Sequence, residues 1–301
     1  MNIEFIDIVQ SLIDGVLYGS TYALIGLGFT LIFGAMEKLN MAYAASSIGG
    51  AYVGLGASVL LSLPLYAIFL IGPIGGGLLS VLVYICCFRY LPSNNHLAAL
   101  MASIGGLFFI DEIISHETDG SPLDFPELGI FSEAYFEIEF SDMFLGFRGD
   151  LIFVMFASFL AMLLLMYLLY RTRLGLATRA VSQQPVAAQL CGISIHQTNS
   201  ITFILAGVLG GIAGCLAAAS VGVISPLLVL PLTVKGLIVT VIGGLGSIRG
   251  AIIAGLLVGG LESVFLLLRG VNERDIYVFL LLFVFLVFRP NGFFGAEINR
   301  D

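Results

Sequence analysis

The chain has 301 residues, of which 59% are hydrophobic and only 11% are charged, and its formal net charge is −8. A soluble domain of ordinary composition carries roughly 25% charged residues, so these values exclude that class and indicate a polytopic membrane protein. Spans of about 20 apolar residues each use up nearly all of the length and leave no sizeable soluble domain. We therefore predict an all-α membrane protein with a single transmembrane domain over residues 1–301.

Apolar runs recur along the whole chain and predict a bundle of about eight or nine membrane-spanning helices. The candidate spans are residues 12–34, 42–62, 65–88, 97–114, 151–170, 200–220, 228–247, 250–268 and 276–288. Glycine pairs at a spacing of four residues occur in several of them, at 15 and 19, 50 and 54, 207 and 211, 210 and 214, and 255 and 259. Small residues let helix backbones approach closely in a bilayer, so we expect these pairs at helix crossings, within the chain more often than between subunits.

Hydroxyl and amide side chains gather near the inner end of the first two spans. They are Thr30, Asn40, Tyr43, Ser46 and Ser47. Weak and transient hydrogen bonds from such groups suit the passage of a small polar solute, which makes these residues candidates for the substrate pathway. For each of them, helix capping or a hydrogen bond to the backbone of its own helix is an equally good explanation.

One long loop, at about 115–150, carries many acidic residues and a single arginine, Arg148. Eight of the twelve basic residues fall at the other ends of the spans, at Lys38, Arg89, Arg171, Arg173, Arg179, Arg249, Arg289 and Arg300. The positive-inside rule places this basic side in the cytoplasm and the acidic loop outside, with the N-terminus outside and the C-terminus cytoplasmic. The acidic loop either stays solvated or steers a cationic partner, and YFEIEF within it alternates as a strand does. Nothing in this charge pattern indicates nucleic acid as a partner.

The inner loop, at about 171–200, interrupts two strongly apolar stretches. Pro185 suits the first turn of a helix, and Gly192 suits the left-handed position just beyond its end. The residues between them predict one short helix, on which Val186 and Leu190 share an apolar stripe beside Ala187 and Ala188. Such a helix docks either on a soluble partner or on the lipid headgroups, because the nearby arginines fit both surfaces.

Two ionisable residues lie within consecutive antiparallel spans. Counted at 1.5 Å per residue, Lys235 and Glu262 lie at similar depth, roughly 10 and 12 Å from the outer face. An ionisable group there is costly unless it is paired, so we predict a salt bridge or a shared polar cavity. In the alternative arrangement, Lys235 extends to the outer headgroups and Glu262 faces water. Pro226 and Pro231, between 224 and 235, also allow a re-entrant or broken helix at this point.

The three histidines have no second ligand at metal spacing, and no catalytic Ser/His, paired Asp or HExxH arrangement occurs inside the spans, so we expect neither a metal site nor an enzyme. No GxxxxGK[ST] motif occurs, and the only lysines are Lys38 and Lys235, so the chain has no phosphate-binding loop of its own.

Three stretches resemble the signatures of one family, in order and at suitable separations. They are GVLYGSTYALIGLGFTLIFGAMEKLNMAYA, RTRLGLATRAVSQQPVAAQLCGI and VIGGLGSIRGAIIAGLLVGGLES. Together they look like those of the branched-chain amino acid type of ABC transporter permease, and the resemblance covers nearly the whole chain. It implies a multi-pass subunit in the bacterial inner membrane that passes a branched-chain or similar small amino acid by alternating access.

The same resemblance implies partners and roles. The partners would be a second permease subunit, homologous or identical, two ATP-binding subunits and an external solute-binding protein, with ATP hydrolysed by the partners and no cofactor bound here. The inner loop resembles the segment that seats on an ATPase subunit, so Arg179, Gln184, Ala187, Ala188 and Gly192 become coupling residues together with Pro185 and Leu190 of the predicted helix. The chain departs from the family pattern at Tyr43, where a histidine is usual, and at Arg249, where a proline is common.

The departure at Tyr43 leaves the identity of the substrate open. A permease for urea or another small amide is one alternative. A self-sufficient secondary transporter or channel is another, and it predicts transport by the purified chain with an ion gradient alone.

Overall fold

The computed structural model describes residues 5–91, 96–126, 128, 135–140, 143–289 and 292–294. The helices are α1 (Phe5–Met36), α2 (Ala42–Leu60), α3 (Ile68–Val83), α4 (His96–Glu117), α6 (Gly149–Arg171), α7 (Arg173–Gln183), α8 (Pro185–Leu190), α9 (Ile195–Val221), α10 (Val229–Gly243), α11 (Ile248–Arg269) and α12 (Val271–Phe288). Short strands are β1 (Leu123–Asp124), β2 (Tyr135–Phe140), β3 (Met143–Arg148) and β4 (Val223–Ile224). The fold is therefore almost entirely helical, as the composition predicts.

Within these described ranges, seven helices are long and apolar enough to cross a membrane: α1, α3 with the turn that follows it, α4, α6, α9, α10 with the turn before it, and α11. The predicted spans at 42–62 and 276–288 also form helices, α2 and α12, but neither belongs to that set. The chain is thus an all-α polytopic membrane protein, and its count of eight or nine spans stays a prediction.

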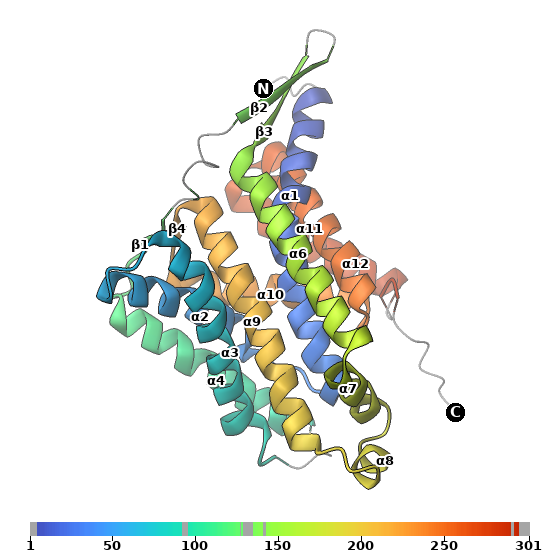
Figure 1. The fold of residues 1–301 in the computed structure, drawn as a ribbon. Coiled ribbons are helices and arrows are strands. Elements are labelled where there is room, and N and C mark those ends of the chain that lie inside the picture. The colour runs from blue at the N-terminus through green and yellow to red at the C-terminus, as the bar shows by residue number, and fades with distance from the viewer. Residues whose placement is uncertain are drawn as a thin grey trace.

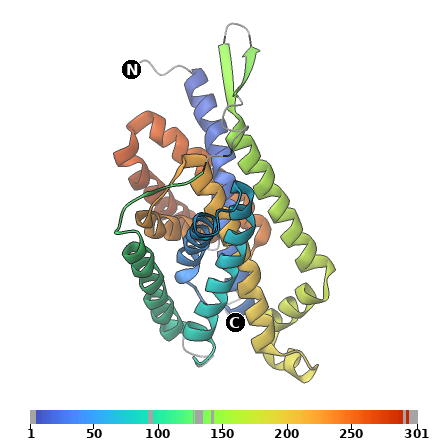
Figure 2. The ribbon, with the colours of Figure 1, turned by 60° about the vertical axis from the view of Figure 1, so that its left-hand side comes forward.

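The two ends of the bundle differ in kind (Figure 1). The antiparallel hairpin of β2 and β3 projects from one end, beside the start of α1, while α7 and α8 lie at the opposite end, and the turned view agrees (Figure 2). The strand expected from the alternation in YFEIEF is β2, in which Glu137 lies opposite Gly146 of β3. Parts of the predicted acidic loop, at 127, 129–134 and 141–142, lie outside the described residues, as does Arg300.

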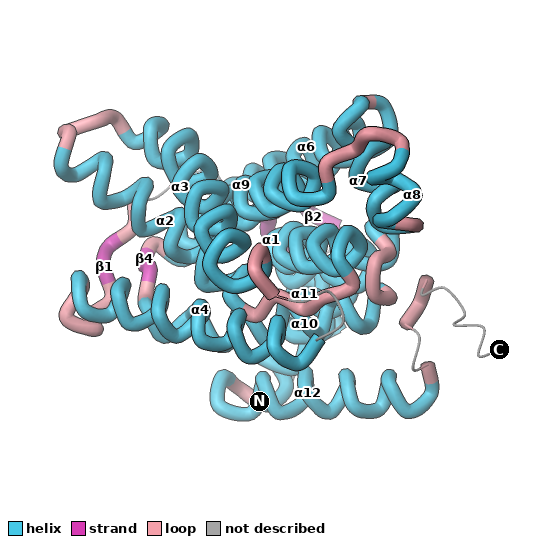
Figure 3. The backbone as a smooth tube through the Cα atoms, turned by 90° about the horizontal axis from the view of Figure 1, so that it is seen from below, coloured by secondary structure: helices cyan, strands magenta, loops and turns pink. Residues whose placement is uncertain are grey.

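Helix α1 packs most extensively against α11, and the contact depends on glycine. Gly15 and Gly19 of α1 face Gly255 and Gly259 of α11, so closely that a Cβ atom on Gly19 would lie 2.9 Å from the carbonyl oxygen of Gly255. A side chain on either surface would separate the backbones and forfeit dispersion contacts along the seam. Seen from below, α12 runs along the edge of the molecule next to α10 and α11 (Figure 3).

A second glycine seam joins α2, α3 and α9. Gly76 of α3 lies between Gly50 of α2 and Gly211 of α9, and a Cβ atom on Gly50 would lie 2.7 Å from the Cα of Gly76. All five glycine pairs expected at crossings lie against other helices of the same chain. Close packing within the subunit therefore accounts for these pairs.

The stretch from 224 to 235 enters the bundle irregularly, but α10 then continues as a helix. The Ser225 hydroxyl accepts from the Leu227 backbone N–H, a short 3₁₀ turn covers Pro226–Leu228, and α10 follows at once. Pro231 lies in the first turn of α10, where its missing N–H leaves no helical bond unmade. The tight start of α10 fixes the height at which Lys235 enters the bundle.

Candidate functional site

Lys235 of α10 and Glu262 of α11 form an ion pair inside the bundle, with 2.7 Å between the Lys235 Nζ and the Glu262 Oε1. Both residues are 5% exposed. The structure thus brings together the two side chains that the sequence places at equal depth, and Lys235 does not extend to the headgroups. Each charge compensates the other, because a buried charge without a partner would be costly at this position.

Tyr22 of α1 completes this arrangement. Its hydroxyl donates to the Glu262 Oε1 over 3.2 Å and accepts from the Lys235 Nζ over 3.3 Å. The ammonium also lies 5.3 Å from the centroid of the Tyr22 ring, within the range of a cation–π contact. Sequence reasoning missed Tyr22 because a tyrosine in an apolar run is ordinary, and only the fold shows that α1 passes both α10 and α11.

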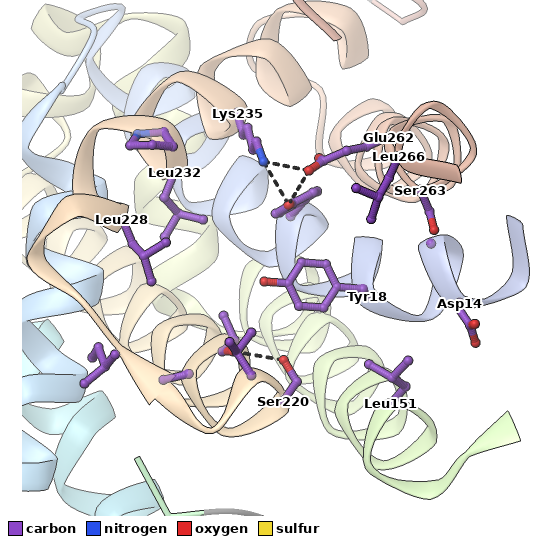
Figure 4. A pocket seen from close by; sticks show the side chains of 18 of the residues that line it. Asp14, Tyr18, Leu151, Ser220, Leu228, Leu232, Lys235, Glu262, Ser263 and Leu266 are labelled. Carbon is purple, nitrogen blue, oxygen red and sulfur yellow. Dashed lines mark hydrogen bonds and ion pairs between the residues drawn. The ribbon is translucent and has the colours of Figure 1, made fainter. Parts of the chain in front are cut away.

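The ion pair lies in the wall of a pocket of about 470 Å³ enclosed by α1, α6, α9, α10 and α11. Figure 4 shows Lys235 and Glu262 pointing toward each other, with Leu232 near Lys235 and Leu228 beyond Leu232. Ser220 of α9 lines the pocket as well. The pocket therefore combines a compact charged site with a largely aliphatic wall, the usual makeup of a small-molecule site.

Asp14 of α1 lines the same pocket and connects it to the hairpin. Its carboxylate accepts from the Gln10 Nε2 over 3.0 Å. The Gln10 amide in turn bonds the backbone of Gly146 in β3 twice, accepting from its N–H and donating to its carbonyl oxygen. A continuous chain of hydrogen bonds thus runs from the projecting hairpin to the pocket wall.

Arg148, at the end of β3, lines the pocket from the hairpin side. Its guanidinium binds Asp150 through two hydrogen bonds, and the shorter ion-pair distance is 2.6 Å. The same group donates to the carbonyl oxygen of Ser220 at the end of α9. The charged residues in the pocket lining are therefore two acids, Asp14 and Glu262, and two bases, Lys235 and Arg148, so their formal charges cancel.

None of the five hydroxyl and amide residues expected near a pathway lines this pocket, and all are at most 1% exposed. Ser46 donates to the carbonyl oxygen of Ala42, and Ser47 donates to that of Tyr43. Asn40 caps α2 by accepting from the Ala42 N–H. Thr30 is buried in α1, and its hydroxyl has no hydrogen-bonding partner among the described residues. The two serines and Asn40 thus make the local hydrogen bonds that were the alternative to a pathway role. A pathway role for the five residues stays a prediction.

Tyr43, which stands where the family usually has a histidine, is fully buried in α2. Its ring meets Phe29 edge-on at 4.9 Å between centroids. Its hydroxyl points at glycine surfaces, since a Cβ atom on Gly210 would lie 2.9 Å from it. The larger aromatic residue is therefore accommodated by the absence of side chains opposite, at Gly28 and Gly210.

The inner loop contains two helices where the sequence predicted one. Helix α8 matches the prediction, with Pro185 in its first turn and Gly192 beyond its end at a φ of 83°. Helix α7 was missed because its apolar residues are interrupted by arginines, and it is held by Thr172, whose hydroxyl accepts from the Gly175 N–H. Together, α7 and α8 form a helical projection that contacts α6 and α9.

The apolar stripe predicted on α8 is present and uncovered. Val186 is 72% exposed and Leu190 is 85% exposed, while Ala188 is buried against the chain. Gln184, Ala187 and Gly192 are also exposed. Arg179 lies on α7, where its guanidinium donates to the Gly175 carbonyl oxygen and lies 5.5 Å from the centroid of the Tyr170 ring. Arg179 thus fastens α7 to the end of α6. Helix α7 is exposed as well, with Leu176 at 61%, but the most exposed apolar side chains are those of α8.

A second cavity, of about 690 Å³, lies between α2, α3 and α4. Its wall is mostly aliphatic and aromatic, with Tyr52, Glu117, Thr118 and Asp124 as its polar members. The pocket around Lys235 is therefore the better candidate for a polar solute.

In the part of the chain that the structure describes, no three His, Cys, Asp or Glu side chains come together in a group suited to a metal ion.

Comparison with known proteins places residues 11–288 within the family described as the permease component of branched-chain amino acid transport systems. The permease protein BraD of a Pseudomonas aeruginosa high-affinity branched-chain amino acid transport system is 30% identical, over 99% of both chains. The corresponding LivH of Escherichia coli K12 is 26% identical over the full length of both, and a probable LivH of Methanocaldococcus jannaschii is 28% identical over 82% of this chain and 78% of its own.

Proposed function

The chain belongs to the family of branched-chain amino acid transport permeases, and from this premise we propose that it is the membrane subunit of an ABC importer for a branched-chain or similar small amino acid. The match over nearly the whole chain, including the relative at 30% identity, is the observation that carries the proposal. The same relatives favour this function over a urea permease or a self-sufficient secondary transporter.

Helix α8 is the surface that an ATP-binding subunit would cover. Its six residues form too short a helix to be stable alone in water, yet α7 and α9 hold it in place with Val186 and Leu190 turned outward. Two exposed aliphatic side chains on a short projecting helix fit a cleft in a soluble partner. Two ATP-binding subunits, a second permease subunit and an external solute-binding protein complete the proposed assembly.

The proposed orientation puts α8 in the cytoplasm and the hairpin outside. The end with α7 and α8 carries Arg171, Arg173 and Arg179, which agrees with the positive-inside rule. The start of α1 lies at the hairpin end (Figure 1). The Phe293 backbone N–H donates to the carbonyl oxygen of Ile242, near the inner end of α10. The last described residues therefore lie at the inner end, which supports a cytoplasmic C-terminus.

Reconstitution tests this function directly. The chain, purified with ATP-binding subunits, a second permease and a solute-binding protein, is expected to accumulate leucine in proteoliposomes only when ATP is supplied. Leucine uptake by the isolated chain under an ion gradient would contradict the proposal and favour a secondary transporter.

Docking through α8 has its own test. Replacing Val186 and Leu190 together with serine is expected to reduce co-purification of the ATP-binding subunits by about tenfold or more, because the apolar contact is lost. The matched control is Leu227→Ser, which changes an equally exposed leucine (80%) at the other end of the molecule. Equal co-purification from the double variant and the control would show that α8 is not the docking element.

A further inference from the structure

We propose that the pocket between α1, α9, α10 and α11 binds the transported amino acid as a zwitterion, by insertion of its charged groups between Lys235 and Glu262. The substrate carboxylate takes the place of Glu262 beside the Lys235 ammonium, and the substrate ammonium takes the place of Lys235 beside the Glu262 carboxylate. This inference rests on the proposed function and names the place in the chain where the substrate is held.

The size and wall of the pocket suit this class of ligand. Its volume of about 470 Å³ exceeds that of one small amino acid and leaves room for a few waters. Leu228, Leu232 and Ile224 form an aliphatic surface on the α10 side of the pocket. With the charged groups held at the ion pair, a branched apolar side chain lies against this surface and buries its methyl groups.

The charges of the pocket select for a ligand that carries both signs. When a zwitterion enters, one ion pair becomes two, and both Lys235 and Glu262 keep an opposite charge next to them. A ligand with only a carboxylate would leave Glu262 unmatched, and one with only an ammonium would leave Lys235 unmatched. An unmatched charge in a buried site is strongly unfavourable, so either ligand is penalised relative to the free amino acid.

Tyr22 makes the exchange of partners feasible. Its hydroxyl already donates to Glu262 and accepts from Lys235, so it can stay bound to either residue while the other turns to the ligand. Asp14 and the ion pair of Arg148 with Asp150 supply further charges of both signs toward the hairpin side of the pocket. A zwitterion therefore meets charges of both signs on its way in, which favours passage over tight retention.

The test uses the assembled transporter without its solute-binding protein, so that only sites in the membrane complex are sampled. The thermal unfolding midpoint is measured against increasing concentrations of leucine, N-acetylleucine and leucinamide. Leucine is expected to raise the midpoint, and the singly charged analogues are expected to need about tenfold or higher concentrations for the same rise. An analogue that stabilises the complex as well as leucine does would overturn the proposal, as would the absence of any leucine effect.

A variant pair locates the site. Replacing both Lys235 and Glu262 with methionine removes the charges without leaving one unpaired, so the complex is expected to assemble but to lose the response to leucine. Glu112→Gln, which makes a carboxylate-to-amide change at an exposed position on α4 away from the pocket, is expected to respond as the wild type does. A full leucine response from the methionine double variant would place the binding site elsewhere.

ATP-driven leucine uptake, measured with the solute-binding protein present, separates this inference from the function beneath it. If the wild type accumulates leucine and the methionine double variant does so equally well, the transport function stands and the pocket proposal fails. If the wild type accumulates none, the proposed function fails and this inference fails with it.

Discussion

The bundle contains two clusters of polar side chains that satisfy their hydrogen bonds in different ways. Around Lys235, three helices contribute one group each, and the hydrogen bonds among Tyr22, Lys235 and Glu262 join one helix to another. Around Ser47, the serine hydroxyls bond backbone carbonyls four residues earlier on their own helix. A serine hydroxyl has one proton to place and finds an acceptor within one turn, whereas the Lys235 ammonium and the Glu262 carboxylate find their partners on other helices.

This difference explains why a pocket lies beside one cluster and tight packing beside the other. The serines of α2 need no distant partner, so glycine surfaces of α9 can close directly on them. The charges of α10 and α11 must reach each other across a space, and their long side chains leave part of that space unfilled. Hydroxyls in an apolar helix are therefore a weaker indication of a cavity than ionisable groups are.

The largest effect is expected from Glu262→Gln. The substitution leaves the Lys235 ammonium buried without a carboxylate, and breaking a buried pair in this way costs about 3–5 kcal/mol of unfolding free energy. The purified subunit is expected to unfold at a markedly lower temperature and to express poorly. The measurement is the unfolding midpoint in detergent.

The methionine double variant at Lys235 and Glu262 is the control for that prediction. If burial of an uncompensated charge is the cause, the double variant is more stable than Glu262→Gln although it has lost more of the native interaction. A double variant less stable than the single one would attribute the loss to packing at α10 and α11 and would weaken the contrast between the two clusters.

The ion pair is predictable from sequence because depth in a bilayer follows from counting residues along apolar runs. Lys235 and Glu262 are each rare in such a run, and consecutive spans are neighbours, so few pairings remain. Tyr22 could not be identified in this way, since its role depends on α1 passing between elements more than 200 residues away in sequence. Long-range packing, which local periodicity does not encode, decides that contact.

The same limit applies to element boundaries. Helix α1 begins at Phe5, ahead of the predicted apolar run at 12, because polar residues of its first turns are held by the hairpin. Gln10 is the example, with both of its amide groups bonded to Gly146. Helix α8 was predictable because Pro185 and Gly192 mark its ends locally, while α7 has Thr172 as a local marker of its start but lacks a regular apolar period.

An intermediate effect is expected from Tyr22→Phe. The phenyl ring keeps the packing and the position under the Lys235 ammonium, and only the hydroxyl that joins Lys235 to Glu262 is lost. Hydrogen bonds to charged groups contribute about 1.5–3 kcal/mol, so a loss toward the lower end of that range is expected while the ion pair remains. Double-mutant cycles with Glu262→Gln measure the coupling, and additive effects would show that Tyr22 does not bridge the pair.

The smallest effect is expected from Ser47→Ala, and it tests the other side of the comparison. The Ser47 hydroxyl donates to the carbonyl oxygen of Tyr43, which is already engaged in the helix, so its removal is expected to cost less than about 1 kcal/mol of unfolding free energy. ATP-driven leucine uptake is expected to be unchanged, because the hydroxyl is fully buried and faces no part of the pocket around Lys235. Ser46→Ala, whose hydroxyl is bonded in the same way to Ala42, is the matched control. If Ser47→Ala alone reduced uptake severalfold at unchanged stability, α2 would have to open toward a solute during transport, and the pathway predicted for its hydroxyls would hold in a conformation other than this one.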